Sequence, residues 1–351
     1  MDDICSRLFS WYDVHKRDLP WRSTRNPYYI WISEVILQQT RVVQGYGYFL
    51  HFIEQFPTVE VLAAASEDDV MRAWQGLGYY SRARNLHTAS KQIVAMGGFP
   101  VTYEGIRRLK GVGDYTAAAI ASFAFDEPKA AVDGNVCRVW SRIFGVDAPV
   151  DSIVGKRVIT EIAQKLLPED YAAKYNQAVM EFGALQCTPH SPSCADCPLA
   201  DKCVALAEGR VDLLPLKSHK VKVTPRYLSY LYIHNADSLL LHKRTGNDIW
   251  QNLYELPLIE TDEAMDADSL FLHPDFVAWS EAIPYIYMGA VRGVKHVLSH
   301  RVLYASFYEL EVQGDLPCPE EYVVVPFAEL DRYALPRLLE RYMEEKSKLW
   351  E

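Results

Sequence analysis

The sequence predicts two domains, a mostly helical one followed by a smaller α+β one. Residues 1–207 carry apolar side chains at helical spacing between glycine and proline breaks. Residues 208–224 are polar and rich in lysine, and they predict a linker. Residues 225–351 hold short runs of tyrosine, valine and isoleucine, which favour strands. A length of 351 residues also suits about two domains.

The elements can be placed along the chain from these patterns. The predicted helices of the first domain are 30–43, 67–75, 83–96, 115–124, 135–144 and 155–167. The predicted strands of the second domain are 227–233, 239–242, 302–310 and 322–325, and a closing helix is predicted at 336–348. The second domain is then about the size that supports a single core.

Composition excludes several classes of protein. Hydrophobic residues make up 49% and charged residues 23%, which is enough to build folded cores. Seven cysteines are too few for a disulfide scaffold, and no run approaches the ~18 apolar residues of a membrane helix. The start of the chain lacks the basic-then-apolar order of a signal peptide. We therefore expect a cytoplasmic protein that is neither secreted nor membrane-spanning.

The net charge of −10 does not decide whether the chain binds nucleic acid. Residues 1–215 carry 22 basic and 25 acidic side chains, against 14 and 21 in the remainder, so the acid excess lies mainly in the second part. A nucleic-acid-binding domain is usually basic, but backbone N–H groups can also hold phosphates.

Four of the seven cysteines fall in one short stretch and predict a metal centre. Their spacing is C-x6-C-x2-C-x5-C. Such a group in a chain that is not secreted is typical of a metal or cluster site. Structural zinc usually takes two close pairs, and only one such pair occurs here. A single loop closing on itself favours a 4Fe–4S cluster over the zinc alternative. The predicted ligands are Cys187, Cys194, Cys197 and Cys203.

A glycine-rich turn precedes the helix predicted at 115–124. Gly111, Val112 and Gly113 stand directly before an alanine-rich run. Glycine permits positive φ and close approach of the backbone, and N–H groups at a helix start can bind a phosphate oxygen. The turn therefore predicts a helix-hairpin-helix that holds a phosphate. An ordinary turn between two helices is the alternative, and the nearby cysteine loop favours the hairpin. We expect a locally basic surface near both.

The hairpin, an aspartate at Asp133 and the four-cysteine loop together resemble the endonuclease III superfamily of DNA base-excision glycosylases. The resemblance covers the whole first domain. Members that also cleave the strand carry a lysine two positions after the second hairpin glycine, where it forms a Schiff base with the sugar. Tyr115 occupies that position here and cannot form an imine. This argues against an endonuclease III-like pyrimidine glycosylase-lyase.

Two further segments resemble the MutY family of adenine DNA glycosylases. Residues 31–40 read WISEVILQQT and residues 76–82 read GLGYYSR. The resemblance implies a monofunctional enzyme that removes adenine mispaired with 8-oxoguanine or guanine in duplex DNA. We expect it to act as a monomer associated with the nucleoid. A non-catalytic DNA-binding or redox-signalling iron–sulfur protein is the alternative, and the presence of both Glu34 and Asp133 argues against it.

Cleavage of the bond between adenine and deoxyribose calls for two carboxyl groups in different protonation states. One donates a proton to the leaving base, and the other stabilises positive charge on the sugar. We assign Glu34 as the acid toward adenine N7 and Asp133 as the ionised partner. Burial must then raise the pKa of Glu34, while a helix start would favour the charged form of Asp133. The resemblance implies that Tyr115 and Asn135 orient these two groups.

The target base must leave the helix before its glycosidic bond is accessible. By resemblance, the mispair is recognised by Gln39, Thr40, Leu77 and Tyr79. Core packing is the alternative for Leu77. The resemblance also places Arg22 and Glu181 at the adenine pocket.

The second domain resembles the Nudix-like domain of the same family, through residues 242–244 and 250–257. It lacks the R-E-x-x-E-E segment that holds metal in Nudix hydrolases, so we expect recognition of 8-oxoguanine in place of hydrolysis. The family uses a Phe-Ser-His loop for this recognition. Here Ser299 and His300 are present, but Leu298 replaces the phenylalanine. The alternative for this stretch is a strand edge without DNA contact.

Overall fold

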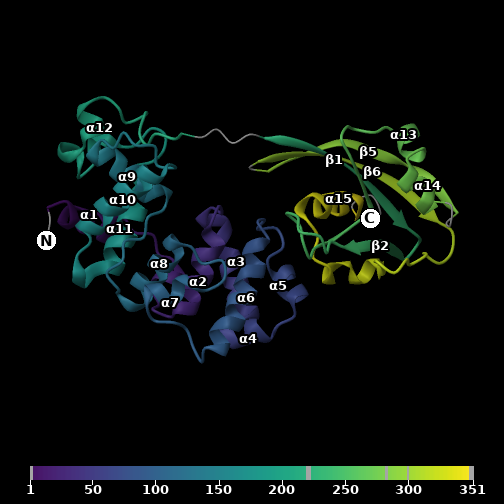
Figure 1. Cartoon of the computed structure of the whole chain (residues 1–351), viewed down its shortest axis with the longest axis horizontal. Helices are drawn as coiled ribbons and strands as arrows, with labels where there is room; N and C mark the ends of the chain where they lie inside the picture. Colours follow the sequence, from purple (N-terminus) through teal and green to yellow (C-terminus); the bar gives the residue numbers. More distant parts are fainter. Residues whose placement is uncertain (1–2, 219–222, 281–283, 299, 348–351) are drawn as a thin grey trace. The chain divides into compact units, whose positions relative to one another are not determined.

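The computed structural model describes residues 3–218, 223–280, 284–298 and 300–347 (Figure 1). By its contacts the chain forms two compact units, Met1–Ala64 with Asn85–His219, and Ala65–Arg84 with Lys220–Glu351. The first unit is helical and the second contains a seven-stranded sheet, which confirms the predicted fold class. Among the described residues, no helix is both long and apolar enough to cross a membrane.

Helices of the first unit pack around two neighbouring sets of apolar side chains. One set joins α1, α9 and α11 around Trp140, Tyr175 and Phe182, and the other is made where α2 packs on α8. The helices are α1 (Asp3–His15), α2 (Pro27–Leu37), α3 (Val42–Gln55), α4 (Val59–Ala64), α6 (Ser81–Ala95), α7 (Tyr103–Arg107), α8 (Asp114–Phe125), α9 (Gly134–Phe144), α10 (Ile153–Leu166), α11 (Ala172–Leu185) and α12 (Val204–Ala207).

The single helix predicted at 30–43 is wrong. The chain forms α2, then a turn, and then α3. Gln39 has a φ of 61°, in the left-handed region that does not continue a helix. Apolar side chains keep helical spacing across this break, which is why the pattern conceals it. The turn brings Gln39 and Thr40 to the wall of the cavity described below.

The sheet of the second unit has the order β3-β2-β1-β6-β5, with β4 beside β1 and β7 beside β2. The central pair, β1 and β6, is parallel and aligns Tyr230 with Phe307 and Leu231 with Tyr308. The strands are β1 (Thr224–His234), β2 (Ser238–Lys243), β3 (Tyr254–Glu255), β4 (Leu258–Thr261), β5 (Tyr285–Val297), β6 (Arg301–Val312) and β7 (Tyr322–Pro326). The four predicted strands are confirmed as β1, β2, β6 and β7.

Both faces of the central strands are covered by helices. On one face, Tyr342 of α15 (Arg337–Ser347) stacks on Phe307 with 3.9 Å between ring centroids. On the other, Leu270 of α13 (Ala267–Phe271) and Phe276 of α14 (Pro274–Ser280) pack on Tyr308. Burial on both faces explains the continuous apolar run of β1, since alternation is lost when neither face is solvated.

Strand β5 was not predicted, although it is the longest strand of the sheet. It lies at the sheet edge beside β6, and most of its side chains are exposed or half-buried. A strand without a buried face carries no alternating apolar pattern, so the sequence does not reveal it.

Helix α5 (Glu67–Ala73) and the loop after it belong to the second unit by their contacts, although they come from the helical part of the sequence. Asp68 accepts a 2.6 Å bond from Lys243, and Arg84 donates a 2.7 Å bond to the carbonyl of Gln251. Trp74 of this segment is fully buried.

Candidate active site

A cavity of about 960 Å³ in the first unit gathers most of the residues assigned from the sequence. Glu34 reaches it from α2, Asp133 from the start of α9, and Tyr115 from the first turn of α8. Asn135, Arg22 and Glu181 also line it, together with Gln39 and Thr40. The two carboxyl groups therefore meet at one cavity, although they are far apart in the sequence.

Glu34 lies within the apolar helix α2 and is only 8% exposed. Burial raises the pKa of Glu34 to about 7. A 2.6 Å hydrogen bond donated by the Tyr115 hydroxyl opposes this shift, and the negative charge of Asp133 adds to it. The carboxyl group is thus poised to exist in both protonation states near neutral pH, as a general acid must.

Asp133 is the N-cap of α9, where its Oδ1 accepts a 2.8 Å bond from the Val136 amide. Asn135 donates a second bond of 2.7 Å to Oδ2. Burial raises the pKa of Asp133, while these two bonds and the charge of Arg138 oppose the rise. The helix start was expected to favour the charged form, but desolvation determines the direction of the net shift.

Tyr115 donates to Glu34, and Asn135 donates to Asp133. The Tyr115 hydroxyl also lies 4.0 Å from Sδ of Met180. Burial raises the pKa of Tyr115 well above its usual value, so it remains a neutral donor. Asn135 is itself held by Arg138, which donates a 2.9 Å bond to its Oδ1. A Cβ on Gly183 would meet Cβ of Asn135 at 2.6 Å, so only glycine allows α11 to approach so closely.

Glu181 forms a buried ion pair with two arginines at the cavity wall. Arg17 and Arg22 each donate two side-chain bonds to its carboxylate, at 2.5–2.9 Å. Burial alone would raise the pKa of Glu181, but the bonds from Arg17 and Arg22 outweigh it and lower the pKa to about 2. Glu181 is therefore a fixed negative charge and a strong hydrogen-bond acceptor.

The glycine turn has the geometry predicted for a helix-hairpin-helix. Helix α7 ends at Arg107, and α8 begins after Gly113, which provides no side-chain cap. Gly111 has a φ of 75°, and a Cβ there would lie 2.5 Å from Cβ of Asn85. Val112 is buried and anchors the turn. The first N–H groups of α8 follow an uncapped glycine, which suits an external phosphate acceptor.

The remaining recognition residues lie in the second unit. Leu77 is 8% exposed, whereas Tyr79 is 47% exposed and has a φ of 48°. The structure thus supports core packing for Leu77, whereas much of the Tyr79 side chain is exposed to solvent. His300 is exposed, and its carbonyl accepts a bond from Thr224. Ser299 lies outside the described residues.

All four predicted cysteine ligands line one small, apolar cavity. In the part of the chain that the structure describes, no three His, Cys, Asp or Glu side chains converge closely enough to hold one metal ion. A cubane binds each thiolate through a separate iron, so its ligands lie farther apart than those of zinc. Burial raises the pKa of Cys197 to about 11, and a bound metal would stabilise the thiolate. The four thiols at one cavity form a donor set that fits an iron–sulfur cluster.

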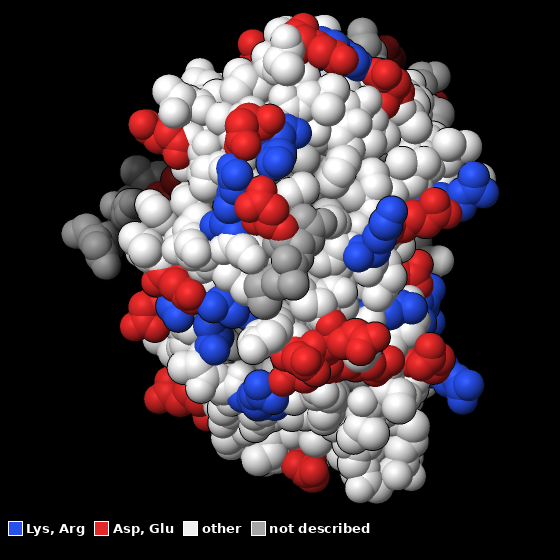
Figure 2. All heavy atoms as spheres, turned by 90° about the vertical axis from the view of Figure 1, so that its left-hand side faces the viewer, with Lys and Arg blue, Asp and Glu red and all other residues white. Residues whose placement is uncertain are grey.

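Charges beside the cysteine loop are balanced, which contradicts the basic surface expected there. Arg7 pairs with Asp3 and Asp201, and Lys202 with Asp3. On the side where Figure 1 labels α1 and α12, Figure 2 shows basic groups adjoining acidic ones. Near the hairpin, Arg108 and Lys110 are exposed.

Three arginines important to the site were not predicted. Arg138 and Arg142 lie on the face of α9 that turns toward the cysteine loop, and both donate to backbone carbonyls of that loop. Arg142 also lies 3.4 Å from Sγ of Cys187. Their spacing from Asn135, at three and seven positions, would have revealed a shared helix face. For Arg17 we find no local sequence signal.

This fold and site define a helix-hairpin-helix DNA glycosylase joined to a Nudix-like domain. Residues 32–169 match the HhH-GPD superfamily of base excision DNA repair proteins, and residues 229–345 match the NUDIX domain. The chain resembles the structure of a thermostable thymine-DNA glycosylase with a TM-score of 0.55 and 27% identity, over 58% of this chain and 95% of that one.

Two relatives that are matched over more than two thirds of their length narrow the family further. The adenine DNA glycosylase of Rattus norvegicus is 32% identical, over 88% of this chain and 70% of that protein. The adenine DNA glycosylase of Buchnera aphidicola subsp. Schizaphis graminum is 33% identical, over 72% of this chain and 74% of that protein. The chain belongs to the adenine DNA glycosylase family.

Proposed function

We propose that the protein removes adenine mispaired with 8-oxoguanine or guanine in duplex DNA, as a monomer acting on chromosomal DNA. The observation that carries this proposal is the pairing of Glu34, with its pKa near neutrality, and Asp133 at one cavity of the first unit. The cavity is large enough for a base turned out of the helix.

The chemical step moves one proton and one electron pair. Glu34 donates its proton to N7 of adenine, and the bond from C1′ to N9 breaks with both electrons passing to the base. The sugar becomes an oxocarbenium ion, which the carboxylate of Asp133 stabilises or traps until water adds to C1′ and gives up a proton to the Glu34 carboxylate. Bonds from Val136 and Asn135 favour the charged form that Asp133 needs. No lysine stands at the hairpin position of Tyr115, so the product is an abasic site in an intact strand.

Each unit contains residues that we assign to recognition of the opposite base. Gln39 and Thr40 line the catalytic cavity, and exposed Tyr79 can stack on a base. In the sequence, Ser299 and His300 follow Leu298, and we assign the hydrogen-bonding role to Ser299. Glu181 and Arg22 offer the flipped adenine an acceptor and a donor.

We propose that Cys187, Cys194, Cys197 and Cys203 hold a 4Fe–4S cluster. When bound, the cluster links the ends of the cysteine loop and gives that loop one conformation. Arg142 supports the site with its contact to Cys187 and its bond to the carbonyl of Thr188. The chemistry at the glycosidic bond does not pass through the cluster.

The decisive experiment measures free adenine released under single turnover from a duplex with adenine opposite 8-oxoguanine. A matched A·T duplex and the variant Glu34→Gln are run beside it. We expect rapid, mispair-dependent release that the variant loses by about 10²–10⁴-fold while it still binds the duplex. An iron-loaded preparation that releases no adenine would reject the proposal and favour oxidised pyrimidines as substrates, or a binding protein.

A further inference from the structure

The loop 244–253 of the second unit contacts two segments that are distant in the sequence. One is the stretch from α5 to Arg84, which includes exposed Tyr79. The other joins β5 to β6, and the structure describes Leu298, His300 and Arg301 of it. Both segments were assigned above to recognition of the base opposite adenine. The loop itself has no assigned role.

At one end, the loop holds the α5 segment through polar contacts of its last residues. Asn252 donates its side-chain amide to Glu67, and the carbonyl of Gln251 accepts a 2.7 Å bond from Arg84. Asn252 has a φ of 67°, so the backbone turns sharply where this contact is made. The ion pair between Lys243 and Asp68 lies just before the loop and strengthens the same junction.

The segment held in this way supports Tyr79 directly. The guanidinium of Arg82 lies 5.6 Å from the Tyr79 ring and 5.2 Å from the ring of Trp74. Arg82 also donates to the carbonyls of Leu77 and Gly78. A shift of α5 would therefore displace the backbone that carries Tyr79.

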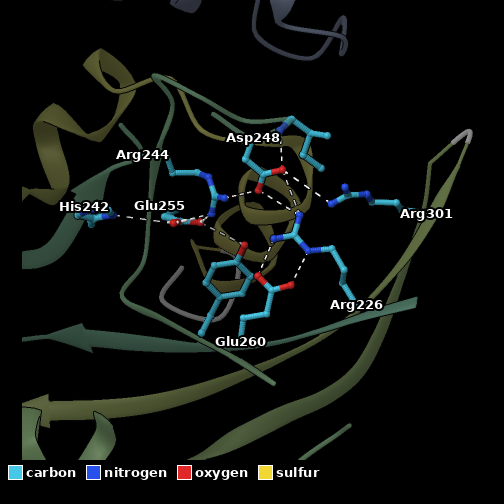
Figure 3. Close-up of polar contacts among 9 residues, drawn as sticks. Arg226, His242, Arg244, Asp248, Glu255, Glu260 and Arg301 are labelled. Atoms are coloured by element: carbon cyan, nitrogen blue, oxygen red, sulfur yellow. Dashed lines mark hydrogen bonds and ion pairs between the residues drawn. The ribbon is translucent and has the colours of Figure 1, made fainter. Parts of the chain in front are cut away.

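At its other end, the loop is fixed by the charge network shown in Figure 3. Asp248 accepts bonds from Arg226 of β1 and from Arg244, and its backbone neighbour Ile249 donates to it at 2.6 Å. Arg244 in turn is paired with buried Glu255 through two 2.7 Å bonds.

The Asp248 carboxylate also reaches Arg301, at the start of β6. Arg301, whose carbonyl accepts a 2.8 Å bond from the Leu298 amide, lies 3.9 Å from Asp248 (Figure 3). Trp250 of the loop also contacts His296, with 6.4 Å between their rings. Asp248 thus lies between three arginines, one of which begins β6.

We propose that loop 244–253 is a positioning element that links the 76–80 loop to Arg301 at the start of β6, with Asp248 as its central positioning residue. The link makes the two recognition segments act together on the base opposite adenine. Asp248 does not touch the substrate and acts through Arg301 and the loop. The effect on base choice rests on the proposed function, whereas the physical link does not.

Two variants of the full-length, iron-loaded protein test the link. Asp248→Asn keeps the shape of the side chain and removes its charge. Asn252→Gly removes the amide that holds Glu67 and tolerates the positive φ. Asp275→Asn, at an exposed position of α14, is the matched control. If Asp248→Asn fails to fold, Asn252→Gly still tests the link where the loop contacts Glu67.

The first readout is hydrogen exchange of the amides of residues 76–80 in the free protein. We expect these amides to exchange faster in both variants than in the wild type, and at the wild-type rate in the control. Unchanged exchange would refute the link, whether or not the protein releases adenine.

The second readout is the ratio of single-turnover adenine release opposite 8-oxoguanine to that opposite guanine. We expect Asp248→Asn and Asn252→Gly each to lower this ratio by about fivefold, and the double variant to lower it no further than the larger single effect. Equal slowing on both duplexes, or additive losses, would overturn joint recognition. If the wild-type protein releases no adenine, the proposed function is rejected, but the physical link that hydrogen exchange tests is not.

Discussion

The hydroxyl of Tyr115 donates a 2.6 Å hydrogen bond to Oε2 of Glu34, across two helices that are more than 70 residues apart in sequence. This bond stabilises the ionised carboxylate, while burial favours the neutral acid and prevails. The pKa of about 7 is the balance of these opposed effects. Tyr115 therefore adjusts the acidity of the group that we assign to protonation of the leaving base.

Replacing Tyr115 with phenylalanine should move the pH dependence of adenine release. Release by the wild type should fall as the pH rises through about 7, where Glu34 loses its proton. Without the hydrogen bond, the pKa of Glu34 rises, so this fall should occur at higher pH. Single-turnover rates measured between pH 5 and pH 9 would show it, and an unmoved or lowered inflection would contradict the assignment.

Glu34→Gln should stabilise the protein in alkaline solution. The folded state raises the pKa of Glu34 above its unfolded value, so its stabilising contribution is complete below about pH 4.5 and is lost as the pH passes 7. Glutamine carries no charge to desolvate. We expect the free energy of unfolding of the variant, relative to the wild type, to rise by about 2–3 kcal/mol between pH 5 and pH 8.

Denaturant titration at both pH values measures this difference. Glu161→Gln, at an exposed side chain that pairs with Arg157 on α10, serves as the control and should show no such trend. If Glu34→Gln were less stable than the wild type at pH 8, Glu34 would not be a desolvated acid.

Glu181→Gln should destabilise the first unit. The change leaves Arg17 and Arg22 without their shared negative partner, and loss of one member of a buried pair costs about 3 kcal/mol or more. Because the folded state lowers the pKa of Glu181 to about 2, its contribution is present above pH 4.5 and is lost as the pH falls toward 2. The gap in unfolding free energy between variant and wild type should narrow over that acidic range; a gap independent of pH would argue against the ion pair.

Cys197→Ser should abolish cluster binding. Iron analysis should find about four irons per chain in the wild type and a large loss in the variant, together with loss of the brown absorbance. Cys318→Ser, at an exposed cysteine outside the loop, should retain both. Stoichiometric zinc in the wild-type protein, with no iron after anaerobic preparation, would instead identify a zinc site.

The sequence determined the fold class, most of the helices, and four strands of the sheet. Repeating apolar patterns and glycine breaks are local signals, because they depend only on residues that are close together in the sequence. Residue identity also limited the chemistry, since four closely spaced cysteines predict a metal centre and Tyr115 cannot form a Schiff base. Residues 30–43 show the limit of this reasoning, because a left-handed turn at Gln39 interrupts an unbroken apolar pattern.

Only the tertiary structure decided how far the pKa of each catalytic group departs from its ordinary value. The pKa of Glu34 depends on its burial and on the hydrogen bond that the Tyr115 hydroxyl donates from α8. Neither is a property of α2 alone. The same holds for Asp133, whose desolvation outweighs its helix cap. The link through Asp248 joins β1, β6 and a loop, so no local pattern could reveal it. Solvation and electrostatic contacts arise from residues that meet only in the folded chain.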